Sequence, residues 1–171
     1  MNRKVWKQIA PDELGNAMKM IGKDWMLIVA RDEEKGKVNG MTASWGFFGV
    51  MWNKPVVVCA IRPQRYTYGL AEREDRLSLA FFSEDHREAL RLCGTQSGRD
   101  MDKLAKAGLS TEMLDGVPVV CEADTVLLCR KLYAGDLNRE GFLDPSLLDN
   151  YKQEDYHRMY VCEIEKAYTK G

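Results

Sequence analysis

The stretch VNGMTASWGFFGVM, from Val38 to Met51, is β-like but contains Gly40, Gly46 and Gly49. Glycines inside a strand often mark a bulge, or a place where another backbone or a ligand approaches closely. The strongly apolar segment PVVVCAI, residues 55–61, follows it almost directly. The sequence therefore predicts two consecutive strands, with a bulge or a close approach along the first.

The rest of the chain continues the β pattern and adds a few helices. Further strands are predicted over 24–31, 76–82, 117–133 and 156–168, and helices over 68–74, 83–94 and 97–109. Strands and helices alternate too rarely for a doubly wound parallel sheet. The pattern favours a mainly β protein, an antiparallel β-barrel with inserted helices.

Composition and charge narrow the class of protein. The 171 residues are 45% hydrophobic and 30% charged, which predicts one domain over 1–171. A formal net charge of -1 argues against nucleic acid as a partner. No apolar run approaches the ~18 residues of a membrane span, and the N-terminus lacks the apolar core of a signal peptide.

Cysteine and histidine usage indicates the compartment and argues against a metal site. The five cysteines are odd in number, widely spaced and without a Cys-x-x-Cys pair, which is typical of reduced thiols in a cytoplasmic protein. The only histidines, His86 and His157, are far apart in the chain, so a zinc site built from Cys and His is not expected.

The segment LCGTQSGRDMDK, residues 92–103, resembles a phosphate-binding loop. Five residues separate Cys93 from Arg99, the spacing of cysteine phosphatases. Cys93, however, ends an amphipathic helix among core-forming residues, where burial would raise the thiol pKa. Asp100 follows Arg99, where those enzymes use a hydroxyl residue. A cysteine phosphatase therefore remains a distant alternative, and Cys93 is expected to serve in packing.

The same loop has two further interpretations. Ser97 and Asp100 form a capping box for the helix predicted over 97–109. On that helix Arg99, Lys103 and Lys106 would share one face. This is either a solvated basic face or an anion site near the helix N-terminus.

A second candidate phosphate site lies at Arg62, Arg65 and Thr67. Both arginines precede a short helix for which Thr67 is a plausible N-cap. Helix N-termini attract anions, and arginine binds phosphate through two N–H groups at once. The alternative is that the arginines pair with Glu72 or Asp75 on the surface.

The segment NGMTASWG, residues 39–46, suggests a place for a flat ligand. Its small residues would allow a ring close to the strand, and N–H groups from Thr42 to Trp45 would bond ring heteroatoms. The alternative is a bulged strand with Trp45 in the core.

Four pieces in this order carry a family resemblance: MTASWG, RPQRYTYGL, CGTQSGRDMDKL followed by AGL, and DYHRMYVCEIE. From DWMLIVA to HRMYVCEIE the chain resembles the flavin-reductase-like proteins of the FMN-binding split barrel, particularly the flavoredoxin group. The resemblance implies a six-stranded antiparallel Greek-key barrel and a homodimer with FMN near the dimer interface.

The resemblance also implies roles for individual residues. The backbone around Thr42, Ala43, Ser44 and Trp45 would line the isoalloxazine ring, and Arg65 and Thr67, with Arg62, would hold the phosphate. Ser97, Gly98, Arg99 and Lys103 would border the same cofactor. His157 matches a histidine that often lies near the flavin and is the candidate catalytic residue; the alternative is an ordinary polar residue on a strand face.

The function implied is that of an FMN-binding oxidoreductase. It would pass electrons from NAD(P)H through the flavin to a small-molecule or protein acceptor. The alternative is a non-enzymatic FMN electron carrier that serves a redox protein partner. The resemblance does not distinguish these two, nor NADH from NADPH.

Overall fold

The computed structural model describes residues 5–171, in which ten strands are joined by three short α-helices and several tighter turns. The strands are β1 (Trp6–Ile9), β2 (Met26–Asp32), β3 (Lys37–Ala43), β4 (Gly46–Met51), β5 (Lys54–Ile61), β6 (Arg76–Phe81), β7 (Thr111–Leu114), β8 (Val117–Val120), β9 (Thr125–Asp136) and β10 (Arg158–Lys170). The helices are α1 (Tyr66–Arg73), α2 (Arg87–Thr95) and α3 (Lys103–Lys106). A π-helical turn spans Met18–Lys23, and 3₁₀ turns span Pro11–Glu13, Glu84–His86, Arg139–Gly141 and Pro145–Tyr151.

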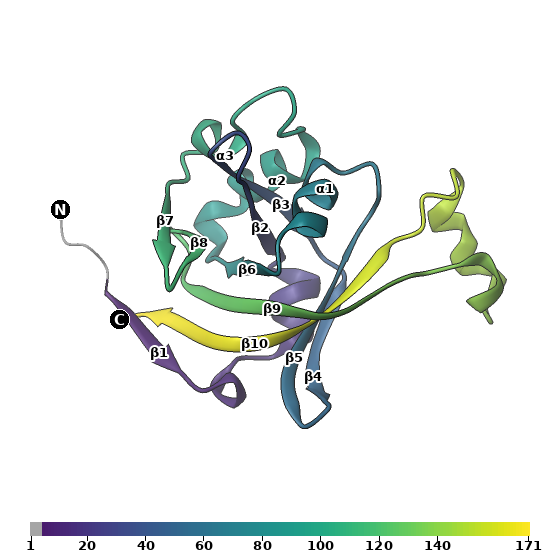
Figure 1. Cartoon of the computed structure of the whole chain (residues 1–171), viewed down its shortest axis with the longest axis horizontal. Coiled ribbons are helices and arrows are strands. Elements are labelled where there is room, and N and C mark those ends of the chain that lie inside the picture. Colours follow the sequence, from purple (N-terminus) through teal and green to yellow (C-terminus); the bar gives the residue numbers. More distant parts are fainter. Residues whose placement is uncertain (1–4) are drawn as a thin grey trace.

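The main sheet is antiparallel and its strand order is β3-β2-β6-β9-β10-β5-β4, with β1 paired beside β10. Strands β3 and β4 are neighbours in sequence but lie at opposite ends of this order. Figure 1 shows the sheet curled, with helices α1, α2 and α3 gathered at one end of it. The mainly β fold with inserted helices is therefore confirmed, as a curled sheet that stays open between β3 and β4.

The sheet contains eight strands, whereas the resemblance implied a six-stranded barrel. The stretch 38–51 forms two strands because the chain turns at Ser44 and Trp45, and residues 6–9 add a further strand. Gly46 permits the turn: its φ is 155°, and a Cβ there would lie 2.4 Å from the Val58 carbonyl oxygen. The predicted strand 117–133 is also divided, and β8 pairs with β7 in a separate hairpin.

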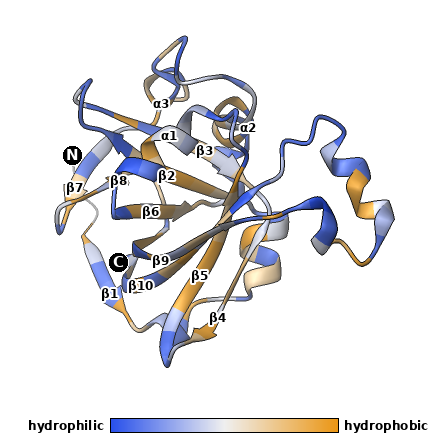
Figure 2. Ribbon diagram, turned by 45° about the vertical axis from the view of Figure 1, so that its right-hand side comes forward, coloured by the Kyte–Doolittle hydropathy of each residue, from blue (hydrophilic) through white to orange (hydrophobic). Residues whose placement is uncertain are grey.

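The core has two parts, one on each side of β2. Met26 and Ile28 belong to the cluster inside the curled sheet. The alternating residues Leu27 and Val29 belong to a cluster under α2, α3 and the β7–β8 hairpin. Burial on both faces explains why this strand is a continuous apolar run rather than an alternating one, as Figure 2 shows by colour.

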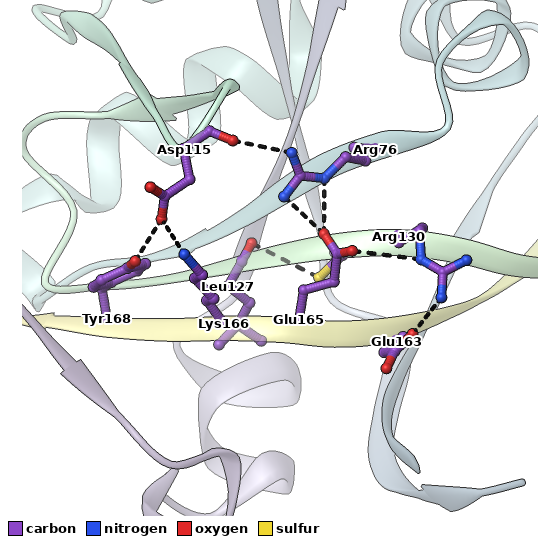
Figure 3. A network of polar contacts seen from close by, with 9 residues as sticks. Arg76, Asp115, Leu127, Arg130, Glu163, Glu165, Lys166 and Tyr168 are labelled. Atoms are coloured by element: carbon purple, nitrogen blue, oxygen red, sulfur yellow. Dashed lines mark hydrogen bonds and ion pairs between the residues drawn. The ribbon is translucent and has the colours of Figure 1, made fainter.

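A polar network ties the β7–β8 hairpin to the main sheet (Figure 3). The Asp115 carboxylate accepts hydrogen bonds from Tyr168 at 2.6 Å and Lys166 at 2.9 Å, and its carbonyl accepts one from Arg76 at 3.0 Å. Arg76 also pairs with Glu165 at 2.7 Å. Solvent-exposed ion pairs of this kind contribute little to stability, so the network mainly fixes the position of the hairpin.

Two predicted helix starts are wrong. Helix α1 begins at Tyr66 with Arg65 at the N-cap position, so Thr67 lies inside the first turn instead of capping it. Residues 97–102 form turns, and α3 begins only at Lys103 because the Asp102 carboxylate accepts a hydrogen bond from the Ala105 N–H. Arg99, Lys103 and Lys106 therefore do not share one helical face.

Residues 137–157 form an arm that leaves the sheet after β9 and returns at β10 (Figure 1, right). It contains the turns Arg139–Gly141 and Pro145–Tyr151. Its returning end contacts Arg62, the residue after β5, through Asp155. Among residues 5–171, no helix is long and apolar enough to cross a membrane.

Candidate functional site

Two adjoining hollows lie where β3 ends, and they share Arg65. The first is an open hollow with about 550 Å³ of empty space, part of which is bulk solvent. It is lined by Met41, Thr42, Ala43, Ser44, Trp45, Ala60, Arg62, Arg65 and His157. The second is lined by Gln64, Arg65, Tyr66, Thr67, Thr95, Gln96, Ser97, Gly98, Arg99 and Lys103. Every site residue expected from the sequence borders one of these two hollows.

The first hollow is built on the end of β3. Thr42 donates its hydroxyl proton to the Leu90 carbonyl at 2.6 Å, which ties the end of the strand to α2. The Trp45 side chain is 47% exposed, so the alternative that placed it in the core is wrong. Its indole lies 5.1 Å from the His157 ring, between centroids, and the two rings form part of the wall.

Arg65 stands at the junction of the two hollows. Its backbone begins α1, and its guanidinium donates to the Gly94 carbonyl at the end of α2, at 3.0 Å. Burial, and secondarily the charge of Arg62, lower the pKa of this half-buried guanidinium, which stays charged. Among the described residues, the Gly94 carbonyl is the one hydrogen-bond partner of the Arg65 side chain. Further N–H donors of the guanidinium therefore remain for an anion.

A buried polar pair supports the second hollow. The Thr67 hydroxyl oxygen accepts a hydrogen bond from the Asn39 amide at 2.7 Å. A Cβ at Gly98 would lie 2.1 Å from the side-chain oxygen Oδ1 of Asn39 and 2.8 Å from Cδ1 of Tyr66, so only glycine lets the 97–99 loop pack this closely. Sequence reasoning missed Asn39; the signal available was a lone amide between Val38 and Gly40.

Lys103 is buried, with 3% of its surface exposed. It therefore does not belong to a solvated basic face, which was one interpretation of the sequence. Its ammonium donates to the Cys93 carbonyl at 2.8 Å and the Gln96 carbonyl at 3.1 Å, at the negative end of α2. Burial lowers its pKa to about 8. Arg99 donates to the Gln64 carbonyl at 3.1 Å, and its guanidinium lies 5.4 Å from the Tyr66 ring centroid.

Arg62 holds the arm against the first hollow. Its guanidinium pairs with Asp155 at 2.5 Å and donates to the Asn150 carbonyl at 2.9 Å. The acidic partners considered from the sequence, Glu72 and Asp75, are not its partners. The pairing with Asp155 spans 93 residues of sequence, which explains why local spacing did not indicate it.

His157, the last residue of the arm, is largely buried beside Trp45. Its Nδ1 lies 2.8 Å from the Tyr151 hydroxyl oxygen. Burial lowers the pKa of His157 to about 4; the Arg62 charge acts in the same direction and Asp155 opposes it. The imidazole is therefore neutral near pH 7.

The charge of the hollows is one-sided. Four cationic side chains line them, Arg62, Arg65, Arg99 and Lys103, and no Asp or Glu among the described residues does. The charge of Arg62 is offset by its ion pair, which leaves the excess positive charge in the second hollow. The pair of hollows therefore suits a ligand with an uncharged flat end and an anionic end. Within residues 5–171, no three His, Cys, Asp or Glu side chains are placed to bind a metal ion.

Cys93 lies outside both hollows and, as expected, in the core. It is fully buried on α2 within the cluster that contains Leu90 and Leu104. Burial raises the pKa of its thiol, which opposes formation of a nucleophilic thiolate. The geometry gives the cysteine phosphatase alternative no support.

Comparison with known families and structures identifies the class of protein. Residues 18–171 match the model of the flavin reductase like domain. The chain therefore belongs to this family, and its fold is that of a flavin reductase like domain. No match was found among curated protein sequences.

Solved structures with the same fold include both enzymes and flavoredoxins. An FMN-binding domain of a flavin reductase-like enzyme from Shewanella baltica matches with a TM-score of 0.71 at 17% identity, over 99% of this chain and 80% of that one. Flavoredoxin from Methanosarcina acetivorans matches with a TM-score of 0.66 at 21% identity, over 86% and 68%. The styrene monooxygenase flavin reductase of Pseudomonas putida matches with a TM-score of 0.64 at 15% identity, over 85% and 79%.

Proposed function

We propose that the two hollows together bind FMN, with the ring system in the first and the phosphate in the second. The observation that carries this proposal is that an indole-bounded hollow, in which the Arg62 charge is paired with Asp155, adjoins a hollow lined by three cations and no carboxylate. The Shewanella protein, with the same fold, is described as FMN-binding. Arginine forks and the N-terminus of α1 are both suited to a phosphate group.

Individual side chains suit these roles. Thr67 accepts its hydrogen bond from Asn39, so its own hydroxyl proton remains to donate to a phosphate oxygen. Lys103 uses two of three N–H donors on carbonyls and retains the third. Arg65 would contribute its fork, and the backbone of 42–45 would border the ring. Ser97, Gly98 and Arg99 would border the phosphate, and Arg62 would hold the arm at the ring end.

We propose further that the chain is an NAD(P)H-dependent oxidoreductase. The bound flavin would supply the hydride and electron transfer, while the chain supplies binding and orientation. The first hollow is open to solvent, which leaves room for a nicotinamide or an electron acceptor beside the ring. His157, neutral and beside Trp45, would contribute as a polar group at the ring end.

The second candidate is an FMN carrier that exchanges electrons with a redox protein and turns over NAD(P)H poorly. It is kept because structures of this fold include flavoredoxin as well as a monooxygenase's flavin reductase. The first hollow is open to solvent, which is compatible with electron transfer from NAD(P)H or from a redox protein.

We also propose a homodimer in the cytoplasm. Strand β4 ends the sheet and exposes apolar side chains, Phe47, Val50 and Met51, with Trp52 beyond it. An apolar end strand of this kind is usually covered by a partner. All five cysteines are free, and free thiols fit a reducing compartment.

Anaerobic stopped-flow mixing tests the enzymatic proposal. FMN-loaded protein is mixed with NADH or NADPH, and flavin absorbance is followed against free FMN at the same concentration. An NAD(P)H-dependent enzyme bleaches the flavin much faster than free FMN reacts. Bleaching no faster than that of free FMN contradicts the enzymatic proposal and favours the carrier.

A further inference from the structure

Tyr151, at the end of the arm's second 3₁₀ turn, contacts the one histidine of the site. Its side chain is buried, and its hydroxyl lies 2.8 Å from Nδ1 of His157. The two rings are nearly perpendicular, at 84°, with centroids 5.5 Å apart. The arm therefore returns to the sheet carrying a tyrosine that reaches the histidine from the side.

The Tyr151 ring is held in place on several sides. Phe142 and Tyr156 pack on it with ring centroids at 5.6 Å and 5.0 Å. The Arg62 guanidinium lies 5.1 Å from its centroid and is itself fixed by Asp155. A ring constrained in this way positions its hydroxyl without help from a ligand.

The hydrogen bond also determines where the proton of His157 lies. In the described chain, Nδ1 is the acceptor available to the Tyr151 hydroxyl proton, and Arg62 offers only donors. Burial raises the pKa of Tyr151, so the hydroxyl keeps its proton. If Nδ1 donated instead, a buried O–H would be left without an acceptor, which is costly. The neutral imidazole therefore accepts at Nδ1 and carries its proton on Nε2.

Nε2 is the ring nitrogen of His157 that remains available to a ligand. It has no hydrogen-bond partner in residues 5–171, yet it is not among the buried unpartnered atoms, so it reaches accessible surface. The surface that His157 contributes lies in the wall of the first hollow. The charged groups around this imidazole are Arg62 and Asp155, which pair with each other.

We propose that Tyr151 is a positioning residue that fixes His157 as the Nε2–H tautomer and thereby presents a neutral N–H donor to a carbonyl-type oxygen of the ligand in the first hollow. The identity of that ligand rests on the proposed function, whereas the tautomer is a property of the chain alone. On this account His157 acts as a fixed hydrogen-bond donor and not as a proton shuttle near pH 7.

Two-bond ¹H–¹⁵N correlation spectra of ¹⁵N-histidine-labelled protein, recorded without flavin, test the proposal. The expected wild-type pattern is that of a protonated Nε2 and an unprotonated Nδ1. Tyr151→Phe is expected to mix the two tautomers and to raise the His157 pKa, because the bond to the neutral form is lost. Tyr156→Phe is the matched control: it removes a stacked hydroxyl that has no partner in residues 5–171, and it should leave the spectrum unchanged.

The outcomes separate this inference from the proposed function. A wild-type spectrum with the proton on Nδ1 overturns the inference, even if Tyr151→Phe does not fold. An unchanged tautomer and pKa in folded Tyr151→Phe overturns it as well. Failure of the protein to bind FMN, with the Nε2–H tautomer intact, would instead refute only the proposed function.

Discussion

Replacing Arg65 with alanine removes the guanidinium that the two hollows share. The proposed function assigns it to the phosphate, so Arg65→Ala should weaken FMN much more than riboflavin, which has the same ring system without the phosphate. The loss of the bond to the Gly94 carbonyl affects the scaffold and should weaken both ligands alike.

The magnitude follows from the kind of contact. A hydrogen bond to a charged group contributes about 1.5–3 kcal/mol. At about 1.4 kcal/mol per tenfold change, the Kd for FMN should rise by roughly 10–150-fold relative to that for riboflavin. Lys103 and Arg99 stay in the second hollow, so binding is weakened and not abolished. Arg65→Lys should give an intermediate loss because it keeps the charge without the fork.

Flavin fluorescence titrations with both ligands measure this difference. Arg87→Ala is the matched control, because Arg87 also donates to a backbone carbonyl, that of Lys23 at 2.9 Å, but lies outside both hollows. It should leave the FMN to riboflavin ratio unchanged. Equal weakening of the two ligands by Arg65→Ala would refute the phosphate assignment and show that Arg65 acts through the fold.

Four further outcomes are expected. Burial lowers the pKa of Lys103 from 10.5 to about 8, so the preference for FMN over riboflavin should shrink as pH rises through about 8, and Lys103→Met should remove that dependence. The unfolded chain holds this proton to higher pH, so the group destabilises the fold below about 8, and thermal melts should show that cost disappearing toward pH 10.5. Wild type should release no phosphate from an aryl phosphate. Cys93→Ser should keep FMN binding with a modest loss of stability. Phosphate release by wild type that disappears in Cys93→Ser would support the cysteine phosphatase interpretation instead. Light scattering should give the mass of a dimer for wild type and of a monomer for Val50→Lys, because Val50 is 79% exposed on β4. Met18→Lys is the control and should stay dimeric, because Met18 is 87% exposed but lies outside β4. A monomeric wild type with FMN bound would contradict the proposed dimer.

The strands, and the residues that line the two hollows, were largely predictable from sequence. Apolar runs such as 55–61 are recognisable locally, because a strand buried on both faces needs no particular partner to be apolar. The site residues lie in short segments next to glycines or helix starts, and those features mark the places where backbone groups meet a ligand.

The contacts within the site were not predictable in the same way. The pairing of Arg62 with Asp155 and the contact of Tyr151 with His157 depend on how a 21-residue arm, 137–157, folds back. Lys103 is buried because α3 starts at this residue, after the Asp102 N-cap, and its side chain reaches the end of α2. Local periodicity carries no information on either arrangement, since both depend on tertiary packing.

Titration of the purified protein with FMN tests the central claim most directly. Fluorescence quenching of FMN is followed in parallel with riboflavin and FAD, each at matched concentration. Saturable quenching, with tighter binding of FMN than of riboflavin, is the result expected from a ring hollow joined to a cationic phosphate hollow. A protein that is colourless as purified and quenches none of the three flavins would contradict the account.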